Sequence, residues 1–582
     1  MESSTPTTSS NISRAWSSLV IPLGIVACAI AMRGCFLWGS PDRSWPHSAL
    51  YEGDAPLWIR FAQSIRDGRP FEFGLPVHPP GMAWILAWVA PLGANSNYLL
   101  IKLIVAVLGS VNCLLAASLA RRHFGTFVGA TTGLLCAASF GLTVQSATLN
   151  NETPYTLLLL LSILMIHRGA QPISLGRAAL WGGVNAFAAL LRPEHVLIFA
   201  MLPAYSLRRG TDASQRSRRH SRTAVALVAL ATFTLIPIPW SIRAYDAITR
   251  FNTVEAEPVN YDALGIPWAI DARDRFAEFP AFARLPNARL LSALSRQRNQ
   301  KEVTRPFIEK WLVEEVQYTP RPLNPITFIS NQGPLAFALA NHAHADGGFS
   351  TTLLDSVMGM PPSEGAVSTN DFAFGNPRHL RLYQHGYFAG LQFIYLNPVA
   401  AMSLAGKKLA IFMSGVASGV TLWNIPAGVT GTRRPVDQLA ANLSDAKLWS
   451  LLILALVMVG VFTALRRRIG GTLLVVIGAK LLITLAFFGY ARQGVAALPL
   501  VYAFVALGIE RLFITPFVQP GPAALRLGRQ CFYGVCAFIL ISSLWLGGRG
   551  WSYDITGLAD PAPQWGASAF ESHQPLRIDV IR

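Results

Sequence analysis

Charged side chains are scarce in this sequence, and acidic ones are the scarcest. Only 14% of its 582 residues are charged, with 31 acids against 48 bases, whereas soluble domains carry about 25% charged residues. Hydrophobic residues make up 52% of the chain, and the mean hydropathy is +0.38. These values exclude an ordinary soluble protein. The apolar runs approach about 20 residues without strand-like alternation, which predicts an all-α integral membrane protein.

Cysteine is also rare, with six residues in the whole chain. All six lie in or at the ends of apolar runs, and none falls in the long polar region 244–445. Their spacing does not match a metal-binding motif. A disulfide framework or a structural zinc site is therefore not expected. The cysteines are Cys28, Cys35, Cys113, Cys136, Cys531 and Cys536.

The net charge of +17 would suggest a nucleic-acid partner in a soluble protein. Here the basic residues cluster in short loops between apolar runs, so the positive-inside rule accounts for them and no nucleic acid is expected. If the N-terminus is cytoplasmic, every short basic loop falls inside. This predicts a multi-pass protein of the cell inner (cytoplasmic) membrane. The inside loops are 121–122, 168–177, 208–222, 466–468 and 526–529.

The apolar runs predict about eleven spans of membrane-crossing length. The expected spans are 16–38, 98–120, 125–148, 152–167, 177–191, 194–207, 223–243, 447–465, 470–489, 495–515 and 531–548. They divide the chain into a cytoplasmic tail, an N-terminal membrane core, a large outer region, a C-terminal set of helices and an outer tail. These parts cover 1–15, 16–243, 244–445, 446–548 and 549–582, respectively.

Three shorter segments are also predicted to be helical. Residues 81–92, in the first outer loop 39–97, are apolar but too few to span, which favours a re-entrant or juxtamembrane helix. Residues 391–413 carry an apolar face with two lysines, so we expect a helix lying in the membrane interface. Residues 302–316 form a further helical patch in the outer region.

The outer loops gather ionisable residues that suggest chemistry on a phosphate-bearing substrate. Arginine binds phosphate oxygens in pairs, and a lone carboxylate suits a general base. Phosphate leaves readily as an anion, so one base with an arginine clamp suits sugar transfer better than glycoside hydrolysis, which needs two carboxylates. The candidates are Glu52, Asp54, His78, Glu152, Arg192, Glu194, His195, Arg243 and Arg492.

Each candidate also has a structural reading. Asp54 could cap a helix that begins near Pro56, and Glu152 could favour the N-terminus of its own helix. Arg192 and Arg243 could snorkel from span ends, while His78 could simply lead into the Pro-Pro turn that follows it.

Six motifs resemble, in the right order, the GT-C superfamily of polyprenyl-phosphate-sugar-dependent glycosyltransferases, related to protein O-mannosyltransferases and lipid A aminoarabinose transferases. They cover roughly residues 15–245 and 385–510, and nothing matches in 245–385. The motifs are EGDAPLWIRFAQSI with a following HPPG, LNNETPYTLLL, AALLRPEHVLI, IPWSIRAY, FIYLNPVAAMSLAGKKLAIF and ARQGVAALPLVYAF.

The resemblance implies a sugar transfer from a polyprenyl-phosphate donor to an acceptor hydroxyl on a protein, lipid or glycan, at the outer membrane face. Asp54 matches the catalytic aspartate of the first loop, and Glu152 the acid of the second, which would position the acceptor or a divalent cation. Arg192 and Arg492 would contact the donor phosphate. Further expected substrate contacts are Glu52, His78 and Arg243.

Two departures from the family pattern leave questions open. The usual Asp-Glu pair is replaced by Glu52-Gly53-Asp54, and the late Arg-Tyr pair by Arg492-Gln493. Either Glu52 or Asp54 could therefore be the base. The alternative functions are a transporter or flippase of lipid-linked sugars, which would want internal repeats, and a non-catalytic relative. The sugar, the acceptor and the need for a metal stay open.

Overall fold

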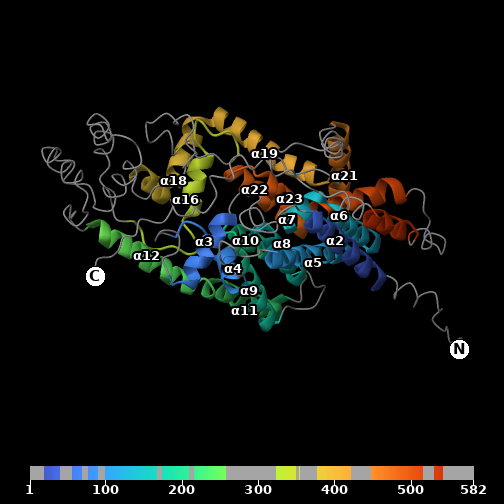
Figure 1. Cartoon of the computed structure of the whole chain (residues 1–582), viewed down its shortest axis with the longest axis horizontal. Coiled ribbons are helices and arrows are strands. Elements are labelled where there is room, and N and C mark those ends of the chain that lie inside the picture. The colour runs from blue at the N-terminus through green and yellow to red at the C-terminus, as the bar shows by residue number, and fades with distance from the viewer. Residues whose placement is uncertain are drawn as a thin grey trace.

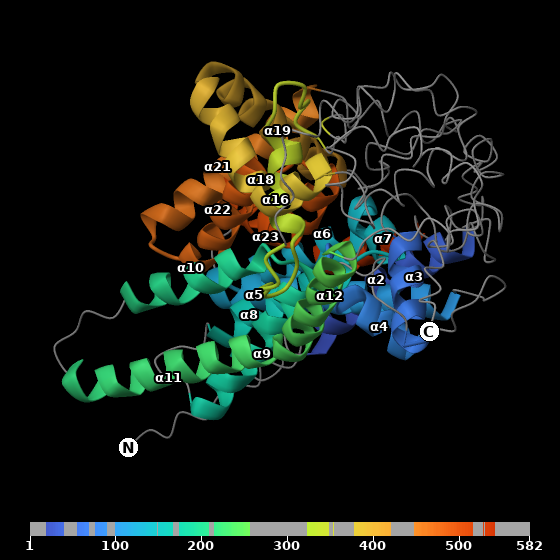
Figure 2. The same ribbon diagram turned by 90° about the vertical axis from the view of Figure 1, so that its left-hand side faces the viewer.

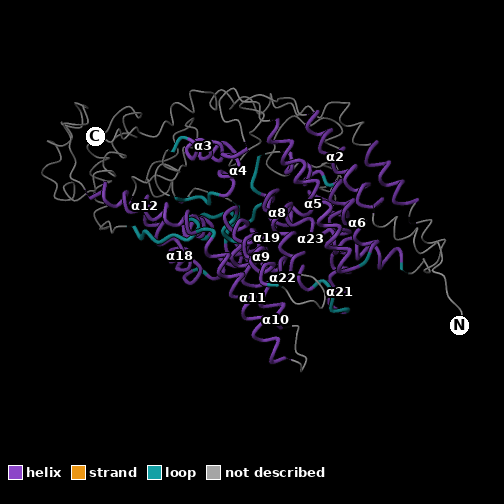
Figure 3. Tube along the Cα trace, turned by 90° about the horizontal axis from the view of Figure 1, so that it is seen from below, coloured by secondary structure: helices purple, strands orange, loops and turns teal. Residues whose placement is uncertain are grey.

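The computed structural model consists of helices and loops throughout the part of the chain that it describes (Figure 1). The all-helical prediction is confirmed for this part. The tube view likewise shows helices and loops in the described segments (Figure 3). The described residues are 19–39, 55–68, 76–89, 99–147, 149–166, 174–208, 215–256, 323–348, 353, 377–420, 447–515, 528 and 530–541.

Two of the described helical stretches are long and apolar enough to cross a membrane by themselves, Leu100–Phe124 and Gln493–Ile514. The first lies in α5 (Leu99–Phe124), and the second joins α23 (Ala491–Ile509) to a short π-helix, Glu510–Ile514. Two bent helix pairs raise the count to four if each pair is one span. The predicted number of about eleven spans is therefore not confirmed by helix length.

The core surrounds α23, which packs against helices from the N-terminal half of the chain as well as against α21 (Lys447–Arg466). The N-terminal partners are α5, α6 (Thr126–Ala138), α7 (Phe140–Ala147) and α8 (Glu152–Ile166). In addition, α2 (Ile21–Gly39) lies along α5 and α6. One continuous apolar cluster joins these helices, so both ends of the sequence build one bundle.

One predicted span, 125–148, is interrupted at Ser139. The backbone of this residue is extended, with φ −63° and ψ 118°, and ends α6. Its carbonyl then accepts the N–H of Thr143 at 3.0 Å, and its hydroxyl accepts the N–H of Leu142 at 3.3 Å, which starts α7. Serine competes in this way with the helical backbone, a feature that hydropathy does not register.

A second break divides the predicted span 223–243. The chain forms α11 (Gln215–Leu235) and α12 (Ile238–Ala256), which are bent by 40°. Pro237 lies in the break. A proline disfavours helical backbone in the residue before it and removes one backbone hydrogen bond, so the helix stops and restarts.

The predicted interfacial helix 391–413 is wrong as a single element, because α18 (Pro377–Leu396) and α19 (Pro398–Val420) meet there at 113°. Pro398 starts α19, a position where its missing N–H costs nothing. The corner exposes apolar side chains, including Tyr395 at 84% and Val399 at 81%. The other helix expected in the outer region, 302–316, lies outside the described residues.

The described part of the segment 39–97, predicted to be the first outer loop, contains two short helices that pack against each other, α3 (Ala55–Arg66) and α4 (Gly81–Val89) (Figure 2). Helix α4 has nine residues, which agrees with the expectation of a segment too short to span. It begins against α9 (Leu175–Leu191), where a Cβ on Gly81 would lie 2.6 Å from the carbonyl oxygen of Leu190. Only glycine permits this approach.

A polar clamp caps the C-terminal end of α22 (Gly471–Ala486). The Lys408 ammonium donates to the Leu485 carbonyl at 3.2 Å and to the Asn341 side-chain oxygen at 2.8 Å. The Asn341 amide in turn donates to the Ala486 carbonyl at 2.8 Å. These bonds satisfy carbonyls that a helix end leaves open. Asn341 follows α16 (Gln332–Ala340), so the clamp connects the region 244–445 to the C-terminal helices.

Candidate functional site

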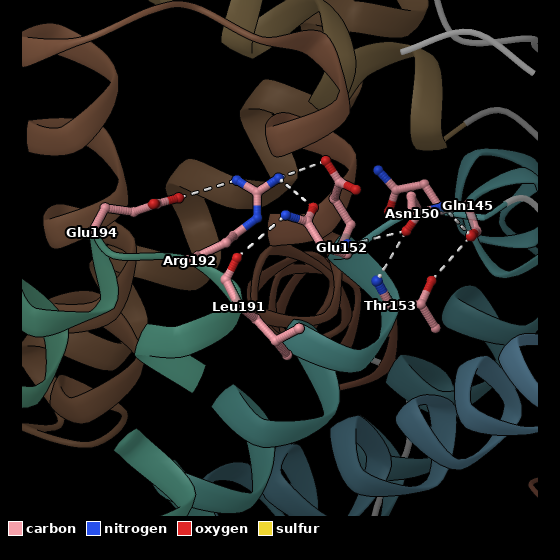
Figure 4. A network of polar contacts seen from close by, with 8 residues as sticks. Gln145, Asn150, Glu152, Thr153, Leu191, Arg192 and Glu194 are labelled. Carbon is pink, nitrogen blue, oxygen red and sulfur yellow. Dashed lines mark hydrogen bonds and ion pairs between the residues drawn. The ribbon is translucent and has the colours of Figure 1, made fainter. Parts of the chain in front are cut away.

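The candidate site lies where two inter-helix turns meet, one before α8 and one between α9 and α10 (His195–Arg208). The second turn begins at Arg192, whose backbone is extended at φ −145° and ψ 105° and whose N–H still closes α9 on the Ala188 carbonyl. Pro193 follows, and a residue before proline avoids helical backbone. The turn therefore directs the Arg192 side chain away from the helix stack, toward the start of α8 (Figure 4).

The turn before α8 is fixed by Asn150. The side-chain oxygen of Asn150 accepts the N–H of Glu152 at 3.0 Å and of Thr153 at 3.2 Å, as an N-cap does. Its amide donates to the Gln145 carbonyl at 2.6 Å, which also accepts the Thr153 hydroxyl at 3.0 Å (Figure 4). Because Asn150 supplies the cap, Glu152 is left in the first helical turn with its carboxylate directed toward Arg192.

Arg192 is the centre of a buried ionic cluster. Its guanidinium pairs with Glu152 at 2.5 Å and with Glu194 at 3.0 Å, and it donates to the Asn151 side-chain oxygen at 3.2 Å (Figure 4). The Asn151 amide reaches back to the Leu191 carbonyl at 3.3 Å. The structure thus brings together two predicted site residues, Glu152 and Arg192, from different loops.

Burial decides between the two readings of Arg192. The side chain of Arg192 is 8% exposed and that of Glu152 1% exposed. A snorkelling arginine would place its guanidinium in water, whereas this one is enclosed with two carboxylates. Breaking a buried ion pair by removing one partner costs about 3–5 kcal/mol. The cluster therefore fixes both turns relative to each other.

Three buried residues beside the cluster form a further chain of hydrogen bonds. The Nε2 atom of His195 lies 2.8 Å from the Asn185 side-chain oxygen, and its Nδ1 atom lies 3.1 Å from the Tyr155 hydroxyl. An amide oxygen only accepts, so the proton belongs on Nε2 and the Tyr155 hydroxyl donates to Nδ1 in the neutral ring. His195 and Asn185 are fully buried, which orients the Tyr155 ring rigidly.

Lys480, on α22, completes the cluster from the C-terminal half of the chain. Its ammonium lies 4.4 Å from the centre of the Tyr155 ring, and the guanidinium carbon of Arg192 lies 5.7 Å from the same centre. Lys480 is 2% exposed. The sequence signal for it is a single lysine inside the apolar run LLVVIGAKLLITLA, because a charge at membrane depth is a functional candidate by default.

The charge balance of the cluster acts on Glu194, which lies in the turn outside the helices. Burial alone would raise the pKa of Glu194. The positive charges of Arg192 and Lys480 outweigh that effect and hold the pKa below the ordinary carboxyl value. Glu194 is therefore ionised at neutral pH, and the cluster contains two carboxylates and two cations.

Two other predicted residues lie elsewhere in the fold. His78 is half-buried against the aromatic rings of Trp58 and Phe61, with ring centres 5.9 Å and 5.8 Å away. This packing supports its structural reading as the entry to the Pro-Pro turn. Arg243 is part of α12 and is half-buried.

The remaining predicted residues fall at the edge of the described part. Glu52 and Asp54 lie outside the described residues, immediately before α3, which begins at Ala55. Arg492 belongs to the first turn of α23, and its side chain is likewise outside the description. Within the described part, His, Cys, Asp and Glu form no group of three or more that could hold a metal ion.

Residues 77–240 match the family described as dolichyl-phosphate-mannose-protein mannosyltransferase. The resemblance predicted from the motifs is confirmed. The matching segment includes His78, Glu152 and Arg192 and excludes Asp54 and Lys480. No curated protein matches the chain.

Solved structures with a similar arrangement include an apo oligosaccharyltransferase of Archaeoglobus fulgidus, with 12% identity and a TM-score of 0.41 over 91% of this chain. This chain spans a little over half of that protein, 56% of its length. ArnT from Cupriavidus metallidurans bound to undecaprenyl phosphate shares 14% identity, with a TM-score of 0.28 over 90% of this chain and 89% of that one.

Proposed function

We propose that this protein is a membrane glycosyltransferase that moves a sugar from a polyprenyl-phosphate donor to an acceptor hydroxyl at the outer face of the cytoplasmic membrane. The observation that carries the proposal is the cluster that the buried residues Glu152, Arg192 and Lys480 form with the partly exposed Glu194 in an apolar helix bundle. Three of these four residues lie in the segment that matches the mannosyltransferase family. Such a concentration of buried charge is typical of a functional site.

In the proposed reaction, the acceptor oxygen attacks the anomeric carbon of the donor sugar. The new bond from oxygen to carbon forms as the bond from that carbon to the phosphate oxygen breaks, with inversion, and the electron pair leaves on the phosphate. Asp54 takes the acceptor proton as general base, with Glu52 beside it as the alternative. The phosphate leaves as an anion and needs no general acid.

Glu152 and Arg192 have separate parts in this proposal. Because Arg192 already binds Glu152 and Glu194, we assign it first to holding Glu152, which orients the acceptor. The donor phosphate would bind at the side of this cluster that faces the outer membrane surface. Arg492, at the start of α23, would contribute a guanidinium to that phosphate. His78 and Arg243 are proposed to make substrate contacts farther from the reacting bond.

The arrangement in the membrane follows from the same proposal. The N-terminus is cytoplasmic, and the charged cluster, the first loop 39–97 and the region 244–445 are outside. The unmatched part of that outer region would choose the acceptor. A flippase would instead need charges near mid-membrane and two related halves. Glu152 starts its helix and Arg192 ends one, and of the four cluster residues only Lys480 lies inside a helix away from its ends.

Donor turnover by the purified protein tests the proposal. The full chain in detergent or nanodiscs is mixed with synthetic polyprenyl-phosphate hexoses and pentoses, and release of polyprenyl phosphate is measured with and without peptide, lipid and glycan acceptors. At least one combination of donor and acceptor should give release of polyprenyl phosphate by the wild type. The variants Asp54→Asn and Glu152→Gln should each reduce this release by about 10²- to 10⁴-fold. Unchanged release in both folded variants would overturn the assigned site.

A further inference from the structure

Lys480 is a buried cation whose ammonium donates no hydrogen bond to the described part of the chain. The residue is 2% exposed, and no hydrogen bond or ion pair joins its ammonium to the described residues. Its close contact is with the face of the Tyr155 ring, 4.4 Å from ring centre to ammonium. The attraction between a cation and a ring face is weaker than the cost of removing an ion from water.

Lys408 shows what a structural buried lysine looks like in the same molecule. It is 1% exposed, and its ammonium has two oxygen acceptors, Asn341 and Leu485. The two lysines are therefore almost equally buried, but only the Lys408 ammonium donates hydrogen bonds to the described residues. An ammonium has three N–H donors. Of these two lysines, Lys480 is the one whose donors have no oxygen acceptor within the described part of the chain.

The surroundings of Lys480 indicate which ligand would satisfy it. Arg192, Glu194 and Glu152 act on it electrostatically, but both carboxylates are bonded to the Arg192 guanidinium. Within the described part of the chain, neither carboxylate forms an ion pair with the Lys480 ammonium. Lys480 is six residues before the end of α22, about 9 Å along the helix axis, and so lies near the same helix ends as the candidate site.

We propose that Lys480 binds the phosphate of the polyprenyl-phosphate donor and is its anchoring cation. This inference rests on the proposed function and deepens it, because it gives the phosphate contact to a residue from the C-terminal half of the chain. As the bond to the anomeric carbon breaks, negative charge grows on the phosphate oxygen. A fixed ammonium in a dry site stabilises that charge more in the transition state than in the bound donor. Arg192 then serves as the framework that keeps Glu152 in place.

The competing explanation is that Lys480 only balances charge. The two carboxylates, Glu152 and Glu194, are matched by the two cations, Arg192 and Lys480, so removing Lys480 alone leaves one negative charge in excess. The double variant Lys480→Met/Glu194→Gln removes one charge of each sign and restores the balance. It therefore separates phosphate binding from charge balance.

The test measures donor KM and kcat for the full chain. It also measures the binding of polyprenyl phosphate that carries no sugar and the binding of inorganic phosphate. Lys480→Met should raise the donor KM and weaken polyprenyl-phosphate binding by about 10- to 100-fold, the worth of a hydrogen bond to a charged group. It should also lower kcat, because negative charge on the phosphate grows in the transition state. Lys480→Arg should recover part of this loss, and the charge-balanced double variant should not. The exposed neighbour of the clamp, Lys407→Met, serves as the control with unchanged values.

Three outcomes overturn the inference. Recovery of donor KM in the double variant would show charge balance, and wild-type KM and binding in Lys480→Met would show no role. Inorganic phosphate binding that depends on Lys480, without polyprenyl-phosphate binding, would show a site for free phosphate instead. Failure of the wild type to turn over any donor would count against the proposed function, while the binding measurement would still report on Lys480.

Discussion

Arg192 and Glu152 are 40 positions apart in the sequence and form a buried ion pair of 2.5 Å. The pair connects the turn before α8 to the turn between α9 and α10, and it lies at the centre of the cluster that includes Glu194 and Lys480. The contribution of the pair to the free energy of unfolding can be measured by replacing its partners singly and together.

Arg192→Met should lower the free energy of unfolding by about 3–5 kcal/mol, because it leaves Glu152 enclosed without its guanidinium. The measurement is the thermal unfolding midpoint of the purified protein. The double variant Arg192→Met/Glu152→Gln should recover part of the loss, since no carboxylate at position 152 is then left unpaired. Equal midpoints for Arg192→Met and the wild type would show that the pair does not contribute to stability.

Some residues of this site could be predicted from the sequence, and others could not. Arg192 and Glu152 were predicted because charges beside apolar runs stand out, and positive-inside topology assigned them to one face. Their direct pairing could not be predicted, since it depends on how α8, α9 and α10 pack. Lys480 was missed because a single lysine inside an apolar run has no local motif, and its partners come from the other half of the chain.

Helix interruptions show a similar limit. The break at Pro237 and the corner at Pro398 follow from proline chemistry, yet hydropathy averaged over a window predicted continuous helices there. At the break at Ser139, the hydroxyl and the carbonyl of this residue accept the N–H groups of Leu142 and Thr143. Such local hydrogen bonds differ little in free energy from those of a continuous helix. Composition predicted the fold class correctly because it depends on the sum of many residues, whereas breaks depend on single ones.

The cap on α8 provides a second prediction. Asn150→Ala removes the acceptor for the N–H groups of Glu152 and Thr153 and should cost about 1 kcal/mol of stability. Because the cap also orients Glu152, donor turnover should fall more than stability does. Asn150→Asp keeps the acceptor oxygen of the cap but loses the amide that donates to the Gln145 carbonyl, so it should recover only part of both properties. If Asn150→Ala lowers the unfolding midpoint but leaves turnover at the wild-type value, the cap has no role in orienting Glu152.

The clamp that Lys408 and Asn341 form at the end of α22 provides a third prediction. Lys408→Met leaves the Asn341 oxygen and the Leu485 carbonyl without their donor, and each buried unsatisfied group costs about 1–3 kcal/mol. The unfolding midpoint should therefore fall clearly, in contrast to Lys407→Met, whose side chain is exposed. A midpoint for Lys408→Met that matches the exposed control would exclude a capping role.

His342 predicts a pH dependence of stability. This residue follows the clamp residue Asn341, is 8% exposed, and accepts the backbone N–H of His344 on Nδ1 at 3.2 Å. Burial, with a smaller contribution from the neighbouring His344, lowers the pKa of His342, against the opposing effects of a hydrogen bond with the Leu339 backbone and of Asp346. The neutral ring is the form that fits the fold.

The sign follows from proton binding. Above the ordinary histidine pKa of about 6.5, neither state takes up a proton and His342 contributes no pH dependence. Below it, the unfolded chain binds the proton first, so stability falls until the lower pKa of the folded state is reached. The unfolding midpoint of the wild type should thus drop more steeply between about pH 7 and pH 5 than that of His342→Asn. Parallel curves would contradict the prediction.

The central claim is tested most directly by release of polyprenyl phosphate from a polyprenyl-phosphate sugar in the presence of an acceptor, compared between the wild type and Glu152→Gln at matched folded concentration. The account predicts release by the wild type and a loss of about 10²-fold or more in the variant. A wild type that releases no polyprenyl phosphate from any hexose or pentose donor, or a variant that releases it at the wild-type rate, would contradict it.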